Sequence, residues 1–302
     1  MTVTERTTED RYPTRLPHAA DLVARADPTV WPGRIPGPFT VDDLAGFDRH
    51  GYLVVKNLLG TDEVTSLQTE AARLADDSSA DDPRVIREKR SGAVRSVFQV
   101  HRTSTVISAL VRNPAVLDRA RQILGSEVYV HQSRINFMPG FTGEGFYWHS
   151  DFETWHAEDG LPAPRAVSMS LALSTNFPYN GGLMVIPGSH RTFVPCIGET
   201  PADHYQASLR EQEIGVPARH DIEQLARPHG IDQFTGPAGS ALWFDSNVLH
   251  GSGNNITPFP RSNVFVVFNS VENTPVEPFA APARRPDYVA ERDFTPLDDA
   301  RR

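Results

Sequence analysis

From Val128 onward the sequence is a succession of short β-type runs, and this pattern constrains the possible fold more than any other feature. The runs are rich in Val, Ile, Leu and Phe, and Gly, Pro, Asn and Ser separate them. They cover residues 128–130, 135–137, 167–173, 182–186, 241–244 and 264–268. Several short strands with such turns predict a sandwich or a barrel. We therefore predict a mainly β fold whose core is a double-sheet jelly roll, with helices packed on it.

The first third of the chain carries the helix signals. Thr40 is followed three residues later by Asp43, which predicts an N-cap with a capping box, and Gly51 predicts the end of that helix. A second helix is expected from about Asp62, where apolar residues recur at helical spacing. Two shorter helices are expected near 105–111 and 114–124, and a short β-type run at 52–55.

We expect one large domain at residues 38–297, in which the helical third packs on the jelly roll. Residues 1–37 lack a period and are rich in Pro, Thr, Arg and Asp, so they predict an extended or partly disordered arm. Residues 298–302 form a tail. The segment from about 196 to 234 is polar and irregular, which predicts a lid-like excursion, with a helix near 205–212.

Composition excludes several classes of protein. Of the 302 residues 39% are hydrophobic and 22% are charged, as in ordinary globular proteins. The net charge of −9 without a basic run argues against a nucleic-acid partner. No run approaches the roughly 18 apolar residues of a membrane span. The N-terminus has no apolar signal core and Cys196 is the single cysteine, so we expect a cytoplasmic protein without disulfides or a cysteine-bound structural zinc. The sequence assigns no role to Cys196.

His149 and Asp151 stand two residues apart in an aromatic-rich stretch, and His250 follows 101 residues later. On a β-strand, residues two apart share a face, so the first two side chains could bind one metal ion together. Two histidines and one carboxylate form the facial triad of non-haem Fe(II) oxygenases, which leaves the other coordination positions open. The alternative is that Asp151 only hydrogen-bonds His149, because His-x-Asp pairs also occur by chance.

Arg261 follows His250 by eleven residues, across a Gly-rich turn that contains Ser252. A hairpin here would bring Arg261 back to His250. Its planar guanidinium could then grip the far carboxylate of an iron-bound 2-oxoacid, and Ser252 could add a hydroxyl. The alternative for Arg261 is a surface salt bridge.

A third marker is the turn Pro187-Gly188-Ser189-His190, in which we expect His190 to be structural and not a ligand. With His149-x-Asp151, His250 and Arg261, this turn resembles the phytanoyl-CoA dioxygenase superfamily. Its members are Fe(II)- and 2-oxoglutarate-dependent oxygenases with a double-stranded β-helix, that is, a jelly-roll, cupin-like core. The stretch Phe146–Ala166 further resembles the signature of ectoine hydroxylases, as do residues 196–201, 204–205 and 212–217. The similarity covers about residues 10 to 297, with a departure at Pro164, where the family is expected to have Met.

The resemblance implies a cytoplasmic enzyme that hydroxylates ectoine to 5-hydroxyectoine with O2 and 2-oxoglutarate, releasing succinate and CO2. It implies Fe(II) on His149, Asp151 and His250, 2-oxoglutarate on Arg261, Ser252 and Asn136, and a homodimer. The implied substrate residues are Gln132, Thr154, Trp155, Ser168, Phe244, Asn263 and Phe265. Trp155 would share a strand face with Asp151, four residues earlier, and offer its ring to the amidinium cation of ectoine. Plain core packing of Trp155 is the alternative.

Two other functions stay open. One is a related 2-oxoglutarate oxygenase that hydroxylates another small amino acid or carboxylate. The other is a jelly-roll binding protein without catalysis, and the presence of all three triad residues counts against it.

Overall fold

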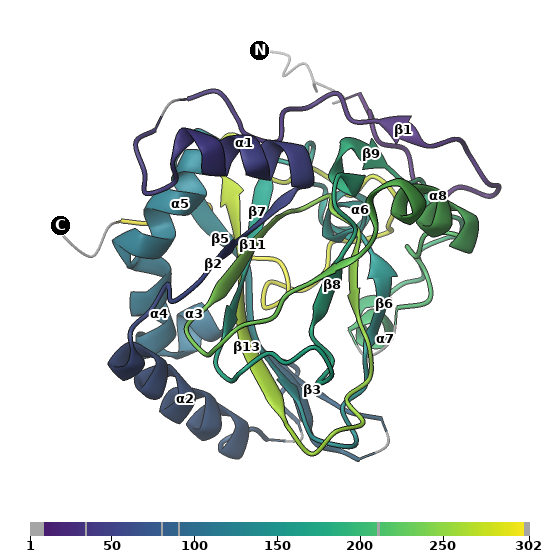
Figure 1. Ribbon diagram of the computed structural model, residues 1–302. Coiled ribbons are helices and arrows are strands. Elements are labelled where there is room, and N and C mark those ends of the chain that lie inside the picture. The colour runs from purple at the N-terminus through teal and green to yellow at the C-terminus, as the bar shows by residue number, and fades with distance from the viewer. Residues whose placement is uncertain (1–8, 34, 80, 90, 210–211, 299–302) are drawn as a thin grey trace, which may run out of the picture.

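The computed structural model describes residues 9–33, 35–79, 81–89, 91–209 and 212–298. Residues 1–8 of the predicted arm and 299–302 of the predicted tail lie outside this range. The described chain folds into two facing antiparallel sheets with helices covering the outer face of the larger one (Figure 1). None of the described helices is long and apolar enough to cross a membrane.

The larger sheet has seven antiparallel strands, and its order places the C-terminal strand β13 at the centre. The strands in spatial order are β2 (Tyr52–Val55), β11 (Ala241–Asp245), β7 (Ala166–Ala172), β13 (Arg261–Ser270), β5 (Val128–Met138), β4 (Val94–Phe98) and β3 (Val85–Arg87). The smaller sheet is β10 (Asp232–Gln233), β8 (Leu183–Val185), β12 (His250–Ser252) and β6 (Phe146–His149). A separate pair joins β1 (Val23–Ala24) to β9 (Thr192–Phe193).

The inner strands of the large sheet are buried on both faces, which explains why β11 and the middle of β13 read as continuous apolar runs. Alternate residues point to opposite faces. In β11, Trp243 packs against the helices, whereas Leu242 and Phe244 point toward the small sheet. There they meet Leu183 and Val185 of β8, so one core lies between the two sheets. This arrangement confirms the predicted mainly β, jelly-roll fold.

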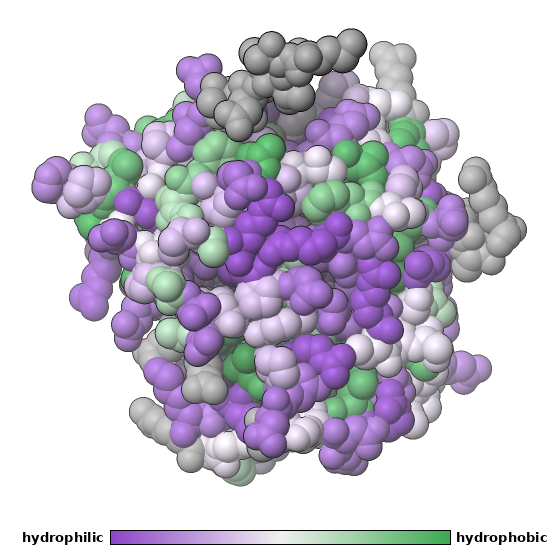
Figure 2. Space-filling model, turned by 180° about the vertical axis from the view of Figure 1, so that it is seen from behind, coloured by the Kyte–Doolittle hydropathy of each residue, from purple (hydrophilic) through white to green (hydrophobic). Residues whose placement is uncertain are grey.

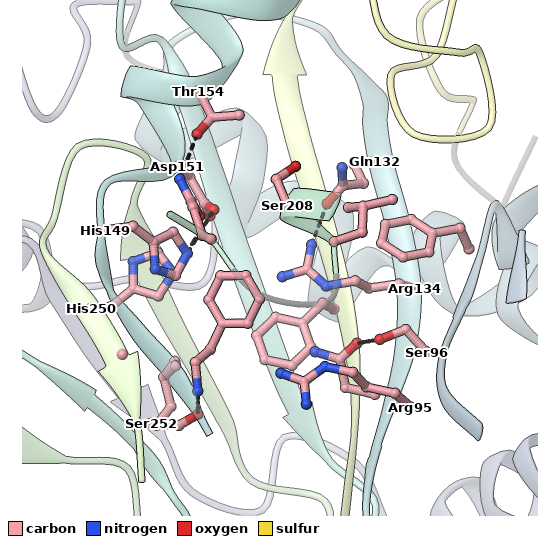
Figure 3. Close-up of a pocket in the computed structure, with 18 of the residues that line it drawn as sticks. Arg95, Ser96, Gln132, Arg134, His149, Asp151, Thr154, Ser208, His250 and Ser252 are labelled. Carbon is pink, nitrogen blue, oxygen red and sulfur yellow. Dashed lines mark hydrogen bonds and ion pairs between the residues drawn. The ribbon is translucent and has the colours of Figure 1, made fainter. Parts of the chain in front are cut away.

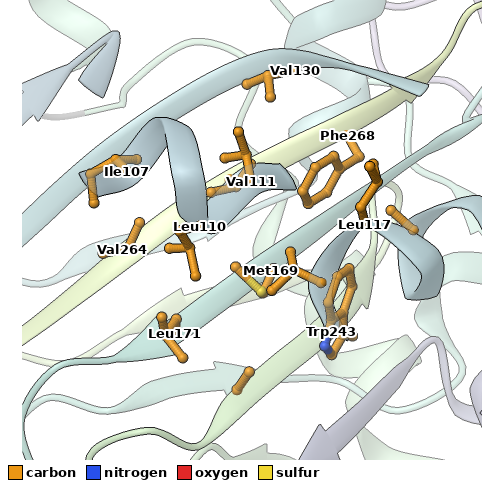
Figure 4. Packing of buried hydrophobic residues seen from close by; sticks show 14 of the residues in the cluster. Ile107, Leu110, Val111, Leu117, Val130, Met169, Leu171, Trp243, Val264 and Phe268 are labelled. Atoms are coloured by element: carbon orange, nitrogen blue, oxygen red, sulfur yellow. The ribbon is translucent and has the colours of Figure 1, made fainter. Parts of the chain in front are cut away.

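The helices supply the second core, on the outer face of the large sheet. The helices of this core are α1 (Val41–His50), α2 (Thr61–Asp76), α3 (Val100–Thr103), α4 (Thr105–Arg112) and α5 (Pro114–Leu124). The helices α6 (Asp151–Thr154), α7 (Tyr205–Ser208) and α8 (Arg219–His229) lie away from this face (Figure 1). A π-helical turn, Trp155–Asp159, continues α6, and Ser189–Arg191 is a 3₁₀ turn. Figure 4 shows Ile107, Leu110 and Leu117 of α4 and α5 packed on the strands that carry Met169 and Phe268.

The helix ends predicted from the sequence are confirmed. Thr40 caps α1 by accepting a hydrogen bond from the Asp43 N–H, and the Asp43 carboxylate accepts the Thr40 N–H in return. Gly51 ends α1 at φ 80°, a left-handed conformation that favours glycine. The Cβ of any other residue there would lie 2.4 Å from the His190 ring, which excludes larger residues.

Several elements differ from the predictions. The runs 128–130 and 135–137 belong to the single strand β5, whose polar middle faces a cavity and so masked the strand pattern. Strands β3, β4 and β12 were not predicted. The polar segment 196–234 contains helix α8. The apolar side chains of this helix, Ile222, Leu225 and Ala226, pack on a small core cluster of Ile186, Val194 and Leu249.

The described part of the N-terminal arm is extended and packs on the body of the protein. Tyr12 is buried, β1 pairs with β9, and Leu16 forms a parallel bridge with Ile197 (Figure 1). Cys196, beside this bridge, is buried, and burial raises the pKa of its thiol well above the usual range. Its thiol donates to the Val194 carbonyl at 3.6 Å, so it packs as an uncharged core side chain.

Candidate active site

His149, Asp151 and His250 converge at one end of the small sheet. His149 is the last residue of β6, and it lies directly opposite His250 of β12 in the strand register. Asp151 starts α6 just beyond β6. Its Oδ1 lies 3.7 Å from His149 Nε2 and 3.8 Å from His250 Nε2. All three side chains are buried and offer ligand atoms within 4.8 Å of one another, close enough to bind one cation (Figure 3).

The expectation that Asp151 lies on the same strand as His149 is wrong, and so is the one that placed Trp155 on a strand. Ser150 breaks the strand because its hydroxyl accepts the Glu153 N–H at 3.4 Å and caps α6. Asp151 therefore enters the site from the first turn of a helix. Trp155 lies one helical turn later, and its main-chain N–H donates to the Asp151 carbonyl. Its side chain therefore still shares a face with that of Asp151.

The main chain orients both histidines as ligands. His149 Nδ1 lies 2.8 Å from the Tyr147 carbonyl, and His250 Nδ1 lies 3.1 Å from the Val248 carbonyl. A carbonyl only accepts, so each Nδ1 carries the proton and each Nε2 keeps a lone pair. Such a hydrogen bond behind a histidine is typical of metal ligands.

The charge states of the triad also suit a divalent cation. Burial alone would raise the pKa of Asp151, but His250 and His149 outweigh burial and hold that pKa well below its usual range. Burial, and then the neighbouring His149, lower the pKa of His250 to about 4. At neutral pH the site therefore offers one carboxylate and a neutral His250, the protonation states that metal binding requires.

Arg261 lies in the same cavity as the triad, without a carboxylate partner among the described residues. It is buried at the start of β13, where Nη1 donates to Asn263 Oδ1 at 2.9 Å and Nη2 contacts the Met138 sulfur at 3.5 Å. Its Nε has no hydrogen-bond partner in the described part of the chain. Burial, and then Arg95, lower the pKa of Arg261 to about 10. A buried guanidinium without an acid is costly unless a ligand compensates it, which fits the carboxylate of a 2-oxoacid.

The predicted hairpin between His250 and Arg261 is wrong, although the two residues do line one cavity. Strands β12 and β13 belong to different sheets, and residues 253–260 cross from one to the other. Ser252 Oγ accepts the Phe146 N–H at 3.1 Å, which leaves its hydroxyl proton available to a ligand. Asn136 lines the cavity too, and its Oδ1 accepts from Ser96 at 2.8 Å.

Across the cavity from the triad stand Gln132 and Arg134 of β5 (Figure 3). The Arg134 guanidinium contacts Gln132 Oε1 and lies 4.8 Å from the centre of the Phe265 ring. Burial lowers the pKa of Arg134 even though Asp151 opposes this effect. Thr154 and Trp155 complete this side of the cavity.

Three predicted substrate residues do not line the cavity but contact residues that do. Ser168 Oγ lies 3.4 Å from Asp151 Oδ2, and the Phe244 ring lies 5.0 Å from that of His250. Asn263 holds Arg261 and donates to Ser170 Oγ at 3.1 Å. His190, as predicted, lies apart from the triad and hydrogen-bonds the Asp48 carbonyl.

Sequence analysis missed the other arginines of the cavity, Arg95, Arg134 and Arg285. Arg134 could have been found, because residues two apart on a strand point to the same face, and Arg134 lies between Gln132 and Asn136 at this spacing. Arg285 comes from the irregular C-terminal segment, where Asp159 binds its Nε at 2.8 Å, and no local pattern announces it. Arg95 and Arg285 are paired with Glu88 and Asp159, so it is Arg134 and Arg261 that favour anionic ligands in this cavity.

Comparison with known proteins decides the family. The model of the family described as phytanoyl-CoA dioxygenase matches residues 47–263. The chain belongs to the phytanoyl-CoA dioxygenase family. Within this family it is similar to the ectoine dioxygenase of Nocardia farcinica, with 65% identity over 289 residues that cover 95% of each chain.

Solved structures similar to this chain agree with the result. EctD from S. alaskensis with 2-oxoglutarate and 5-hydroxyectoine is 43% identical, with a TM-score of 0.85, and the match covers 96% of this chain and 97% of that chain. The same enzyme with bound Fe is 42% identical, with a TM-score of 0.84 and coverage of 96% and 98%.

Proposed function

We propose that this chain is an Fe(II)- and 2-oxoglutarate-dependent dioxygenase that hydroxylates ectoine to 5-hydroxyectoine. One O2 and one 2-oxoglutarate are consumed for each ectoine, and succinate and CO2 are released. The observation that carries this function is the convergence of the triad and the uncompensated Arg261 on one buried cavity. The identity to ectoine dioxygenases and the ligands of the EctD structure support the choice of substrate.

The triad would hold the ferrous ion through His149 Nε2, His250 Nε2 and an Asp151 oxygen. When bound, the ion with 2-oxoglutarate and dioxygen supplies the oxidising power for hydroxylation of a C–H bond. Arg261 would grip the far carboxylate of 2-oxoglutarate, with Ser252 and Asn136 as further donors. Arg261 is buried and oriented by Asn263, so it would bind this carboxylate without first reorganising.

The substrate would occupy the side of the cavity opposite the triad. Ectoine carries a carboxylate and a delocalised amidinium cation. Arg134, which lacks a carboxylate partner in the hydrogen bonds of the described residues, would bind the carboxylate beside Gln132. The faces of Trp155 and Phe265 would take the cation. Thr154 lines the same side, whereas Ser168, Phe244 and Asn263 would support the site from behind the residues they contact.

The segment from about 196 to 234 would act as a lid. Ser208, Leu209 and Gln212 already line the cavity from this segment. A covering segment that excludes water would protect the reactive site during turnover. The whole of residues 38–297 would then act as one oxygenase domain.

Product analysis tests the reaction. The protein supplied with Fe(II), 2-oxoglutarate and O2 should release one succinate for each 5-hydroxyectoine formed. Succinate release that does not rise when ectoine is added would favour the alternative, a related oxygenase for another small amino acid or carboxylate. Absence of any Fe(II)-dependent oxygen uptake would favour a binding protein instead.

The resemblance also supports a cytoplasmic homodimer. Charged and polar side chains cover most of the face seen in Figure 2, with apolar side chains in small separate patches, so a dimer contact on that face would be mixed in character. Light scattering should give a mass near twice the 33.4 kDa of one chain, and a mass of one chain would contradict the dimer.

A further inference from the structure

The N-terminal arm places Arg15 against the helix that carries Asp151. The side chain of Arg15 is only 1% exposed. Its Nε donates to Glu153 Oε1 at 2.7 Å and its Nη2 to Glu153 Oε2 at 2.9 Å, a bidentate pair. Nη2 also reaches Glu158 Oε1 at 3.1 Å. Glu153 lies two residues after Asp151 and directly before Thr154, so the arm fixes the turn of chain that supplies both.

Arg15, Glu153 and Glu158 form a cluster, here called the Arg15 cluster. This cluster also contacts the segment that covers the cavity. We call that segment, the described residues of 196–217, the closing segment. Arg15 Nη1 donates to Thr200 Oγ1 at 3.4 Å, and His204 Nδ1 lies 3.0 Å from Glu158 Oε1. The chain of the closing segment also runs against the pair at Gly215. A Cβ there would lie 2.4 Å from Arg15 Nη2 and 2.5 Å from Glu153 Oε2. Both ends of the closing segment therefore meet Arg15 and its acids.

Thr14 adds a second link of the same kind. Its hydroxyl donates to Glu153 Oε1 at 2.7 Å and accepts the Cys196 N–H at 3.0 Å. Two residues after Thr14, main-chain hydrogen bonds join Leu16 to Cys196 and Gly198 at 3.0 Å each. One short stretch of the arm thus contacts the helix of the iron ligand and the start of the closing segment together.

The closing segment in turn contacts the side of the cavity proposed for the substrate. Gln212 Nε2 donates to Thr154 Oγ1 at 3.2 Å, and Ser208 and Leu209 line the cavity. Arg261, on β13, has no hydrogen bond or ion pair with any member of the Arg15 cluster among the described residues. A change at Arg15 should thus disturb the substrate side more than the 2-oxoglutarate side.

We propose that Arg15 is a positioning residue that couples closure of the cavity to the placement of the helix turn Asp151–Trp155. With the closing segment docked, Thr200 and Gly215 enclose Arg15 against Glu153, and Glu153 fixes the turn that presents Asp151, Thr154 and Trp155. The planar fork of Arg15 satisfies two carboxylates and one hydroxyl at once, which the point charge of a lysine could not do. The identity of the substrate as ectoine rests on the proposed function, whereas the coupling itself does not.

The test compares Arg15→Lys with Arg11→Lys in the Fe(II)-loaded protein. Arg11 is a matched control, because it lies on the same arm but is 43% exposed and pairs with Asp27 at 3.0 Å. We expect Arg15→Lys to raise the KM for ectoine at least tenfold while the KM for 2-oxoglutarate changes less than twofold. Succinate release without hydroxyectoine should increase. Arg11→Lys should match the wild type in both KM values and in the amount of succinate released without hydroxyectoine.

A second readout needs no turnover. Hydrogen–deuterium exchange should be at least fivefold faster in peptides covering 199–217 of Arg15→Lys, with unchanged exchange in α1. If Arg15→Lys does not fold, Thr14→Val removes the bridging hydroxyl without leaving a charge unpaired and should show the same pattern, with about a threefold rise in the KM for ectoine. Unchanged exchange at 199–217, or an equal rise of both KM values, would overturn the coupling. Failure of the wild type to hydroxylate ectoine would overturn only the proposed function, since the exchange comparison would still stand.

Discussion

Arg261 and Arg134 line one cavity from neighbouring strands, and they can be separated by their effects on two anionic ligands. Arg261 stands on β13 with Asn263, and Arg134 stands on β5 with Gln132. Neither guanidinium has a carboxylate partner in the hydrogen bonds of the described residues. Each would therefore serve a carboxylate from a ligand, 2-oxoglutarate for Arg261 and ectoine for Arg134.

Replacement of each arginine by methionine should give reciprocal results. Loss of a buried, charge-assisted pair costs about 2 kcal/mol or more, which corresponds to roughly thirtyfold in affinity. Arg261→Met should raise the KM for 2-oxoglutarate by that factor and the KM for ectoine far less. Arg134→Met should do the opposite. Each variant is the control for the other in steady-state kinetics, and equal effects on both substrates in either variant would contradict the assignment.

The carboxylate of Asp151 should be indispensable. Asp151→Ala removes the single acid of the triad and leaves two histidines without a carboxylate, so the site should lose Fe(II) and turnover together. Metal analysis of the purified variant against the wild type measures this. Asp42→Ala, in the exposed first turn of α1, should keep both. Activity retained by Asp151→Ala at wild-type iron content would reject the metal site.

At the scale of elements, the C-terminal segment after β13 is held to the large sheet by Glu291. The Glu291 N–H donates to the His131 carbonyl at 2.8 Å, and its carboxylate binds Arg102 Nε at 2.9 Å and His101 Nε2 at 3.3 Å. Burial opposes ionisation, but the hydrogen bonds from His101 and Arg102 outweigh burial and lower the pKa of Glu291 to about 2. This segment also supplies Arg285 and the Val289 carbonyl that accepts from Gln132.

Glu291→Gln should therefore destabilise the protein in a pH-dependent way. A carboxyl with a lowered pKa in the folded state contributes stability above its ordinary pKa of about 4.5 and loses this contribution as the pH falls toward 2. The melting temperature of Glu291→Gln should lie below that of the wild type at pH 7, and the gap should shrink below pH 4.5. Glu277→Gln is the control, because Glu277 is 89% exposed on the same segment. A gap that does not change with pH would contradict this role.

The elements show where sequence reasoning succeeds and where it does not. Helix α1 was predictable because its cap, Thr40, and its end, Gly51, lie within the segment itself. Strand β5 was predicted only in pieces because its middle carries polar residues for a cavity that no local pattern reveals. The triad was found through its motif, but the helix at Asp151 was not.

Long-range partners were the least predictable. Arg15 lies in an arm without periodicity, and its partner Glu153 is 138 residues away along the chain. Arg285 meets Asp159 across 126 residues. Both are buried cations whose position depends on an acid that the fold brings to them. Local composition described their segments only as polar and irregular.

For the whole molecule, the site joins parts of the chain that are far apart. Its ligands come from β6, α6 and β12, and Arg261 comes from β13 in the other sheet. These groups converge only in the folded state, so a metal ion and 2-oxoglutarate should bind the folded chain and not the unfolded one. Such binding stabilises the fold by about 2.7 kcal/mol when the free ligand is at roughly 100 times its Kd.

Addition of Ni(II), a redox-inert substitute, and 2-oxoglutarate should therefore raise the melting temperature by several degrees, and a chelator should reverse the shift. The 2-oxoglutarate increment should require the metal, because the proposed site would bind the keto acid end of 2-oxoglutarate through the ion and the other end through Arg261. Asp151→Ala should lose both increments, whereas Arg261→Met should keep the metal increment and lose that of 2-oxoglutarate. If Arg261→Met kept the full rise in melting temperature with 2-oxoglutarate, the far carboxylate of 2-oxoglutarate would have to bind another residue. The other three arginines of the cavity already contact Gln132, Glu88 and Asp159.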